Sequence, residues 1–174
     1  MNNWWDEVAQ TAAAEFSGLT DAAQITRIVL RLLVAALLGG LLGLEREAHG
    51  KAAGLRTHML VCMGSALFML VSQQAGITDT DQSRVIQGLI AGIGFLGAGT
   101  ILKGRDEEKV KGLTTAAGIW MTAAIGVAAG LGLEVTAVLS TLLALMILWL
   151  VPFVLKTLRI DLNDDAPGGR DHQP

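Results

Sequence analysis

Five long apolar stretches occupy most of this 174-residue chain and constrain its fold more than any other feature. They run over residues 25–44, 55–76, 85–102, 113–133 and 135–155, each close to the roughly 20 residues that cross a bilayer core as a helix. Hydrophobic residues make up 52% of the sequence and charged residues only 17%, which is too apolar for a soluble domain of this size. We therefore predict an all-α integral membrane protein, built as a bundle of five transmembrane helices.

The positions of lysine and arginine predict how this bundle is oriented. Basic residues gather in the loops after the first and third stretches and near the C-terminal end. By contrast, the segment up to residue 24 has none, and the loop after the second stretch has only Arg84. Because basic loops are retained in the cytoplasm, we expect the N-terminus outside and the C-terminus in the cytoplasm.

The sequence divides into three regions. Residues 1–24 are expected to be an extracytoplasmic segment, residues 25–157 the membrane domain, and residues 158–174 a disordered cytoplasmic tail, since the tail is polar and contains Pro and Gly. Apolar residues of the first region recur at roughly helical spacing: Trp4, Trp5, Val8, Ala12 and Phe16. Both a helix lying on the lipid surface and a frayed terminus fit this spacing. No basic region precedes the first apolar stretch, so no cleaved signal peptide is expected.

Polar residues before two of the stretches predict where those helices begin. Asp21, followed three residues later by Gln24, matches a capping box for the first helix. Thr80 or Asp81 is expected to cap the third helix.

Glycines at close spacing predict faces on which helices approach one another. Gly92, Gly94, Gly97 and Gly99 crowd the third stretch, and further pairs four residues apart occur in the first and fourth. Small residues let helix backbones come together in lipid. Packing within one protomer and contact between protomers both remain open. Three residues of the following stretch are expected to shape the adjacent surface: Thr114, Thr115 and Trp120.

Polar side chains at membrane depth are few, and no carboxylate falls at the centre of a stretch. A dedicated ion relay is therefore not favoured. The polar residues are expected mainly to form hydrogen bonds between helices: Ser65, Gln73, Gln74, Gln87, Thr100, Thr114, Thr115 and Thr122. Arg31 lies about one turn inside the first stretch, and it is expected to reach outward or to pair with Glu134 or Asp81.

A polar cluster is predicted at the inner end of the bundle. Its expected members are Glu45, Arg46, Glu47, Arg56 and Gln87. Glu45, together with Asp106 and Glu107 of the next inner loop, is a candidate set of Mg²⁺ ligands, because this ion binds through one or two carboxylates and water. A solvated inner face explains the same residues equally well.

Several classes of function lack support in the sequence. The single cysteine, Cys62, and the spacing of the histidines predict no zinc site. No nucleophile and base pairing, phosphate loop or dinucleotide motif is present, so we expect no catalysis. No basic stripe is present, so nucleic-acid binding is not expected either.

Three motifs make the chain resemble a known family. GLEREAHGKAAGLRTH (residues 43–58), GIGFLGAGTI (92–101) and KGLTTAAGIW (111–120) are similar to the MgtC/SapB family of bacterial inner-membrane proteins. The resemblance covers residues 28–155 and implies a multi-pass, five-span domain in the bacterial cytoplasmic membrane. It also implies adaptation to low Mg²⁺ and stress, and, for some members, survival inside host cells and inhibition of the F-type ATP synthase.

Two departures from the family pattern accompany this resemblance. Longer members carry a cytoplasmic ACT-like domain, which has no counterpart in these 174 residues. Thr114 and Met121 stand where virulence-associated members can carry Asn and Cys.

We expect a non-catalytic, homo-oligomeric protein of the lipid bilayer that modulates Mg²⁺, ion and membrane-energy homeostasis. It would act by docking other membrane proteins, of which the F-type ATP synthase is one candidate. No cofactor is expected, although Mg²⁺ binding stays open. The alternatives are a transporter or channel for Mg²⁺ or K⁺, and a cytoplasm-facing Mg²⁺ sensor.

Overall fold

The computed structural model describes residues 3–15, 21–103 and 110–158. These form helices and one short antiparallel strand pair, in the order α1 (Trp4–Glu15), α2 (Ala22–Ala48), α3 (Leu55–Gln74), α4 (Asp79–Thr100), β1 (Leu102–Lys103), β2 (Val110–Lys111), α5 (Leu113–Leu131) and α6 (Glu134–Thr157). In the strand pair, Leu102 lies opposite Lys111 and Lys103 opposite Val110. Every apolar stretch of the sequence is therefore a helix, as predicted.

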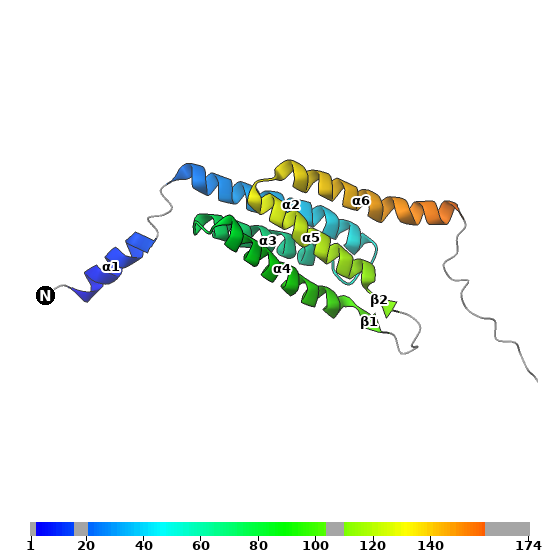
Figure 1. Cartoon of the computed structure of the whole chain (residues 1–174), viewed down its shortest axis with the longest axis horizontal. Coiled ribbons are helices and arrows are strands. Elements are labelled where there is room, and N and C mark those ends of the chain that lie inside the picture. Colours follow the sequence, from blue (N-terminus) through cyan, green and yellow to red (C-terminus); the bar gives the residue numbers. More distant parts are fainter. Residues whose placement is uncertain (1–2, 16–20, 104–109, 159–174) are drawn as a thin grey trace, which may run out of the picture.

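Four of the described helices are long and apolar enough to cross a membrane, namely α2, α3, α5 and α6. The remaining long helix, α4, does not reach the same hydropathy. Its first two turns carry Asp79, Asp81 and Arg84, and its second half is rich in glycine. Residues 4–15 form helix α1, one of the two possibilities that their apolar spacing left open, and α1 lies apart from the bundle in Figure 1.

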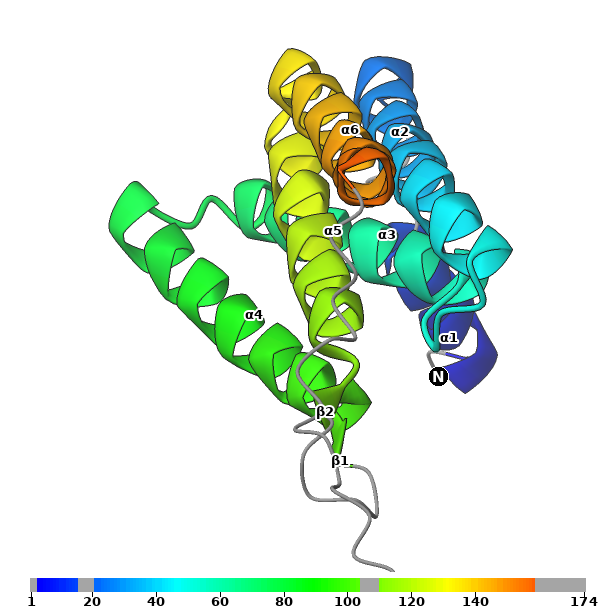
Figure 2. The same ribbon diagram turned by 90° about the vertical axis from the view of Figure 1, so that its right-hand side faces the viewer.

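The bundle is built around α3 and α5. Helices α2 and α5 both pack on α3, and α6 lies along α2 and α5 on the opposite side of the bundle (Figure 1). Helix α4 packs mainly along α5 and diverges from the other helices (Figure 2). The C-terminal ends of α2, α4 and α6 lie at the same end of the bundle as the strand pair, which we call the hairpin end (Figure 1).

Glycines bring the central helices into close contact. A Cβ added to Gly39 of α2 would lie 2.6 Å from the Cβ of Cys62 in α3. Added Cβ atoms on Gly126 and Gly130 of α5 would meet backbone carbonyl oxygens of α3. Of the two readings that the sequence left open for its glycine pairs, these positions take the first, packing within the protomer. The buried core follows the same contacts: Ala35, Leu38, Leu42, Cys62, Ala66, Ile125, Ala129 and Ala137.

Helix starts agree with the sequence at one site and differ at another. The Asp21 carboxylate accepts a hydrogen bond from the Ala23 amide at 2.9 Å and caps α2 as predicted. The expected cap of α4 at Thr80 or Asp81 is wrong, because the helix begins at Asp79 and its cap is Thr78. The Thr78 hydroxyl accepts from the Asp81 amide, so the charged turn belongs to the helix. Residues 159–174 of the predicted tail, which was expected to span residues 158–174, lie outside the described residues.

Candidate functional site

The last turn of α2 places a buried arginine at the hairpin end. Arg46 is only 3% exposed, and its Nη1 lies 3.5 Å from Oε2 of Glu45. The other oxygen of Glu45 lies 3.1 Å from Nδ1 of His49. The Nε and Nη2 of Arg46 have no hydrogen-bond partner among the described residues. A buried guanidinium thus keeps two unused donor nitrogens.

Arg46 lines a cavity of about 440 Å³ between α2, α3, α5 and α6. The polar part of the lining comes from Arg46, His58 and Thr114. The rest is apolar: Leu42, Ala117, Gly118, Met121, Leu143, Ala144, Ile147 and Leu148. Nearly all of the cavity surface is therefore apolar, and the three polar residues lie near the hairpin end of the bundle.

His58 is buried beside this cavity and is held in one orientation. Its Nδ1 lies 3.0 Å from the carbonyl oxygen of Gly54, which can only accept, so Nδ1 is the donor. Its Nε2 faces α5, where an added Cβ on Gly118 would lie 3.5 Å away. Arg46 and Glu45 are both near enough to interact electrostatically with the imidazole. The sequence did not predict that His58 is buried, because its burial depends on how α3 crosses α2 and α5.

Glu47, a predicted member of the polar cluster, has a structural role instead. Its Oε2 accepts a hydrogen bond from the Leu55 amide at 2.7 Å and so caps the first turn of α3. Gly54, just before that helix, has no side chain to do this. The carboxylate therefore joins the end of α2 to the start of α3.

The remaining predicted members of the cluster are not brought together. Arg56 is exposed on α3. The placement of Gln87 at the inner end is wrong: it lies in the first half of α4, roughly 20 Å along the helix axis from the hairpin end. Asp106 and Glu107 lie outside the described residues. Within the described part of the chain, no three His, Cys, Asp or Glu side chains gather closely enough to hold a metal ion.

The predicted glycine face of α4 is mostly unoccupied. Gly97 contacts α5, since its added Cβ would lie 3.5 Å from the Cβ of Ala116. Gly92, Gly94 and Gly99 meet no described atom within 4 Å. A groove of about 450 Å³ runs along α4 beside Phe68 of α3, and it is lined otherwise by Val85, Gly88, Leu89, Gly92, Ile93 and Leu96. We call it the α4 groove.

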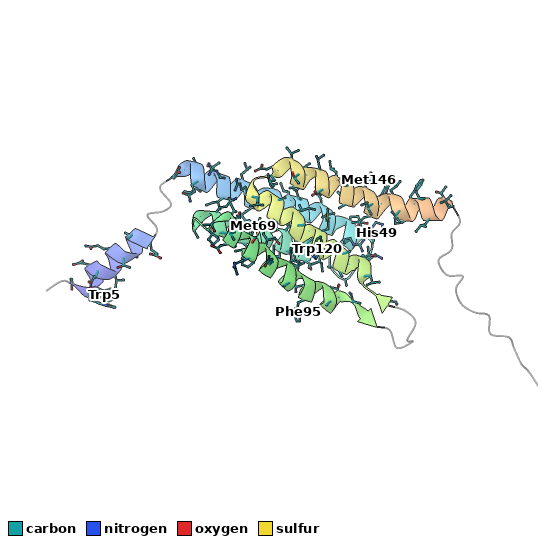
Figure 3. All side chains as sticks on the ribbon, in the orientation of Figure 1. Trp5, His49, Met69, Phe95, Trp120 and Met146 are labelled. Atoms are coloured by element: carbon teal, nitrogen blue, oxygen red, sulfur yellow. The ribbon has the colours of Figure 1, made fainter. Side chains whose placement is uncertain are left out.

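The three predicted residues of α5 lie in different surroundings. Thr115 is buried, while Thr114 lines the cavity of Arg46. Trp120 is half exposed and lines a small apolar cavity of about 140 Å³ between α4 and α5. In Figure 3 it lies between these two helices, whereas Phe95 points away from the bundle. Trp120 therefore belongs to the α4 side of the molecule and not to the arginine cavity.

Two expectations about polar residues at membrane depth are corrected. Arg31 pairs with neither Glu134 nor Asp81. Its Nη1 donates to Oε1 of Gln73 and to the carbonyl oxygen of Gly130, each at 2.9 Å, so it joins α2 to α3 and α5.

Most of the hydroxyl groups form hydrogen bonds within their own helix, whereas bonds between helices were expected. Ser65, Thr100 and Thr122 each donate to a carbonyl oxygen three or four residues earlier in their own helix. A hydroxyl on a helix can always reach such a carbonyl, which makes an interhelical partner unnecessary.

A sequence model of the MgtC family matches residues 32–157. YhiD of Escherichia coli K12, provisionally named a magnesium transporter, is 44% identical over 69% of this chain and 58% of its own length. SrpB of Synechococcus elongatus is 46% identical over 68% of this chain and 71% of its own. MgtC of Salmonella typhimurium LT2 is 44% identical, and the matched part is 49% of that protein. No solved structure matches the chain.

Proposed function

Because the chain belongs to the MgtC family, we propose that it modulates Mg²⁺ and membrane-energy homeostasis by docking helices of partner membrane proteins. The family includes membrane proteins with magnesium-related names, and four helices of this chain are apolar enough to span a bilayer. The chain covers little more than half the length of its Escherichia coli relative, so activity, location and partners are part of the proposal. We place it in the bacterial cytoplasmic membrane as a multi-pass protein.

The observation that carries this proposal is the empty α4 groove. Gly39, Gly126 and Gly130 are already used in packing the central helices. Gly88 and Gly92, which are four residues apart on α4, meet nothing. Such small-residue spacing allows a second helix to approach closely. The groove therefore suits a transmembrane helix of another protein, such as the F-type ATP synthase, or of a second copy of this chain.

We propose α4 as the fifth span. It is 22 residues long and packs along α5, and its Phe95 side chain is 81% exposed on the outside of the bundle. An exposed aromatic side chain at this depth is stable when lipid or an apolar helix covers it. Five spans agree with the distribution of lysine and arginine, which supports an external N-terminus and a cytoplasmic C-terminus.

A pair of glycine variants tests the docking proposal. Gly92→Leu fills the α4 groove, whereas Gly94→Leu changes a glycine of the same helix that lies outside the groove. We expect the first variant to lose cross-linking to partner helices and to fail to support growth of a deletion strain at low Mg²⁺. The second should retain both. Normal cross-linking and growth with Gly92→Leu, at normal abundance in the membrane, would refute docking through this groove.

The alternative is transport of Mg²⁺ or another cation, which the name of the Escherichia coli relative favours. Purified protein in liposomes should then give saturable Mg²⁺ or K⁺ flux that is reduced in Glu45→Gln. A Mg²⁺ sensor would instead show Mg²⁺-dependent thermal stability that is lost on neutralising Glu45, Asp106 and Glu107. The docking proposal predicts neither result.

A further inference from the structure

The cavity of Arg46 has the chemistry of a lipid-binding site. We propose that it binds the phosphate headgroup of a membrane phospholipid, with an acyl chain lying along the apolar wall formed by α5 and α6. This site is separate from the α4 groove, so it does not depend on the proposed function.

The unpaired arginine is the first argument. A guanidinium has five N–H donors, and burial of the charge is unfavourable unless acceptors replace the lost water. Glu45 approaches only Nη1, at the long distance of 3.5 Å, and leaves Nε and Nη2 without an acceptor among the described residues. Two nitrogens on one side of a planar guanidinium match two oxygens of a phosphate group.

The start of α5 supplies an independent argument. Its first backbone N–H groups have no acceptor within the helix, and Gly112 before them offers no side-chain cap. The first turn contains no acidic residue, so the positive end of the helix dipole is not compensated there. Thr114, the second residue of the helix, lines the same cavity as Arg46. A phosphate beside Arg46 would therefore also meet a hydroxyl donor and a favourable helix terminus.

The apolar wall points to a lipid and not to a soluble phosphate. Beyond the three polar residues, the lining is apolar, and α6 contributes Leu143, Ala144, Ile147 and Leu148. Leu143 and Ile147 are more than half exposed, so the wall continues onto the surface of α6 that faces outward from the bundle. An amphiphile fits this arrangement because its headgroup and chain would each meet matching chemistry.

Binding of defined lipids to the delipidated protein, followed by native mass spectrometry, tests this proposal. The probes are phosphatidylglycerol, diacylglycerol with the same chains, and inorganic phosphate alone. We expect one tightly held phosphatidylglycerol and no comparable binding of diacylglycerol or inorganic phosphate. Arg46→Gln should weaken phosphatidylglycerol binding about tenfold or more, because it removes charge-assisted hydrogen bonds.

Two further variants keep the test informative if Arg46→Gln fails to fold. Thr114→Val removes one donor at nearly constant volume, and Ala144→Phe fills the apolar end of the cavity. Both should weaken binding, while Met146→Phe, on the outer surface of α6 (Figure 3), should not. Equal binding of diacylglycerol and phosphatidylglycerol would overturn the proposal, as would displacement of the lipid by inorganic phosphate. Unchanged binding in Thr114→Val and Ala144→Phe would overturn it too.

Discussion

Arg31 of α2 donates a hydrogen bond from Nη1 to the backbone carbonyl oxygen of Gly130, near the C-terminal end of α5, at 2.9 Å. The same nitrogen also donates to Oε1 of Gln73 in α3 at 2.9 Å. One side chain thus joins three helices at the end of the bundle opposite the hairpin. It also supplies a positive charge where the dipole of α5 is negative.

We expect Arg31→Met to destabilise the bundle by about 2 kcal/mol, the contribution of hydrogen bonds from a charged donor. Arg27→Met is the matched control, since Arg27 lies one turn earlier, is exposed, and forms no hydrogen bond or ion pair with a described residue. Thermal unfolding in detergent, followed by circular dichroism, measures both. Equal melting temperatures for the two variants would show that the Arg31 contacts do not hold the helices together.

Replacement by alanine should destabilise the bundle at a glycine that packs against α3, but not at a glycine that lines the open α4 groove. At Gly126, an added Cβ would meet the Cys62 carbonyl and lie 2.8 Å from the Cβ of Ser65, so α5 must move away from α3. We expect Gly126→Ala to cost about 1–3 kcal/mol through overpacking. Gly88 has open space around it, so Gly88→Ala should be neutral or stabilise α4 by up to about 1 kcal/mol. Unfolding of both variants in sodium dodecyl sulfate would compare their stabilities. Unchanged stability of the Gly126→Ala variant would contradict the close approach of α3 and α5.

Glu47 should stabilise the start of α3. Glu47→Ala removes the acceptor of the Leu55 amide, and we expect a loss of about 1 kcal/mol, typical of a helix cap. Glu47→Gln keeps an acceptor oxygen and should lose less. Hydrogen exchange at the Leu55 and Arg56 amides would report the cap directly. Unchanged protection in Glu47→Ala would rule out this role.

Cysteine labelling can decide whether α4 crosses the membrane. Cys62 is the sole cysteine of the sequence and is buried, so Cys62→Ala provides the background for single-cysteine variants. Ile77→Cys lies before α4 and Lys111→Cys lies after it. If α4 spans the bilayer, an impermeant maleimide added to whole cells should label only Ile77→Cys, as the proposed orientation requires.

The labelling experiment has an internal check. Lys51→Cys, between α2 and α3, should behave like Lys111→Cys and react only after the cells are opened. Reaction of Ile77→Cys and Lys111→Cys from the same side would exclude α4 as a span.

The helices were predictable because their signals are local. An apolar stretch of suitable length becomes a helix in lipid whatever its neighbours are, since its backbone groups must bond within the segment. Asp21 was identified as a cap for the same reason, because a cap needs only the first turn of its own helix. The start of α4 was placed too late because its first turn is charged, and charge alone does not end a helix.

The candidate site was only partly predictable. Glu45 and Arg46 were selected from their position after an apolar stretch, but the burial of Arg46 depends on α3, α5 and α6 closing around it. His58 and Thr114 join the cavity through the crossing of helices that are far apart in sequence. Glu47 was grouped with them by adjacency, although a step of one residue on a helix turns the side chain by about 100°.

The sequence by itself determined that this is a helical membrane protein, where its long helices lie, and that it resembles the MgtC/SapB family. Those properties depend on hydropathy and motifs, which are read along the chain. Only the tertiary structure decided which glycines pack against a neighbouring helix. Gly126 packs against α3, whereas Gly92 lines the open α4 groove. It also decided that the guanidinium of Arg46 is buried without enough acceptors among the described residues. Both depend on the relative positions of helices, which the periodicity of a single helix does not encode.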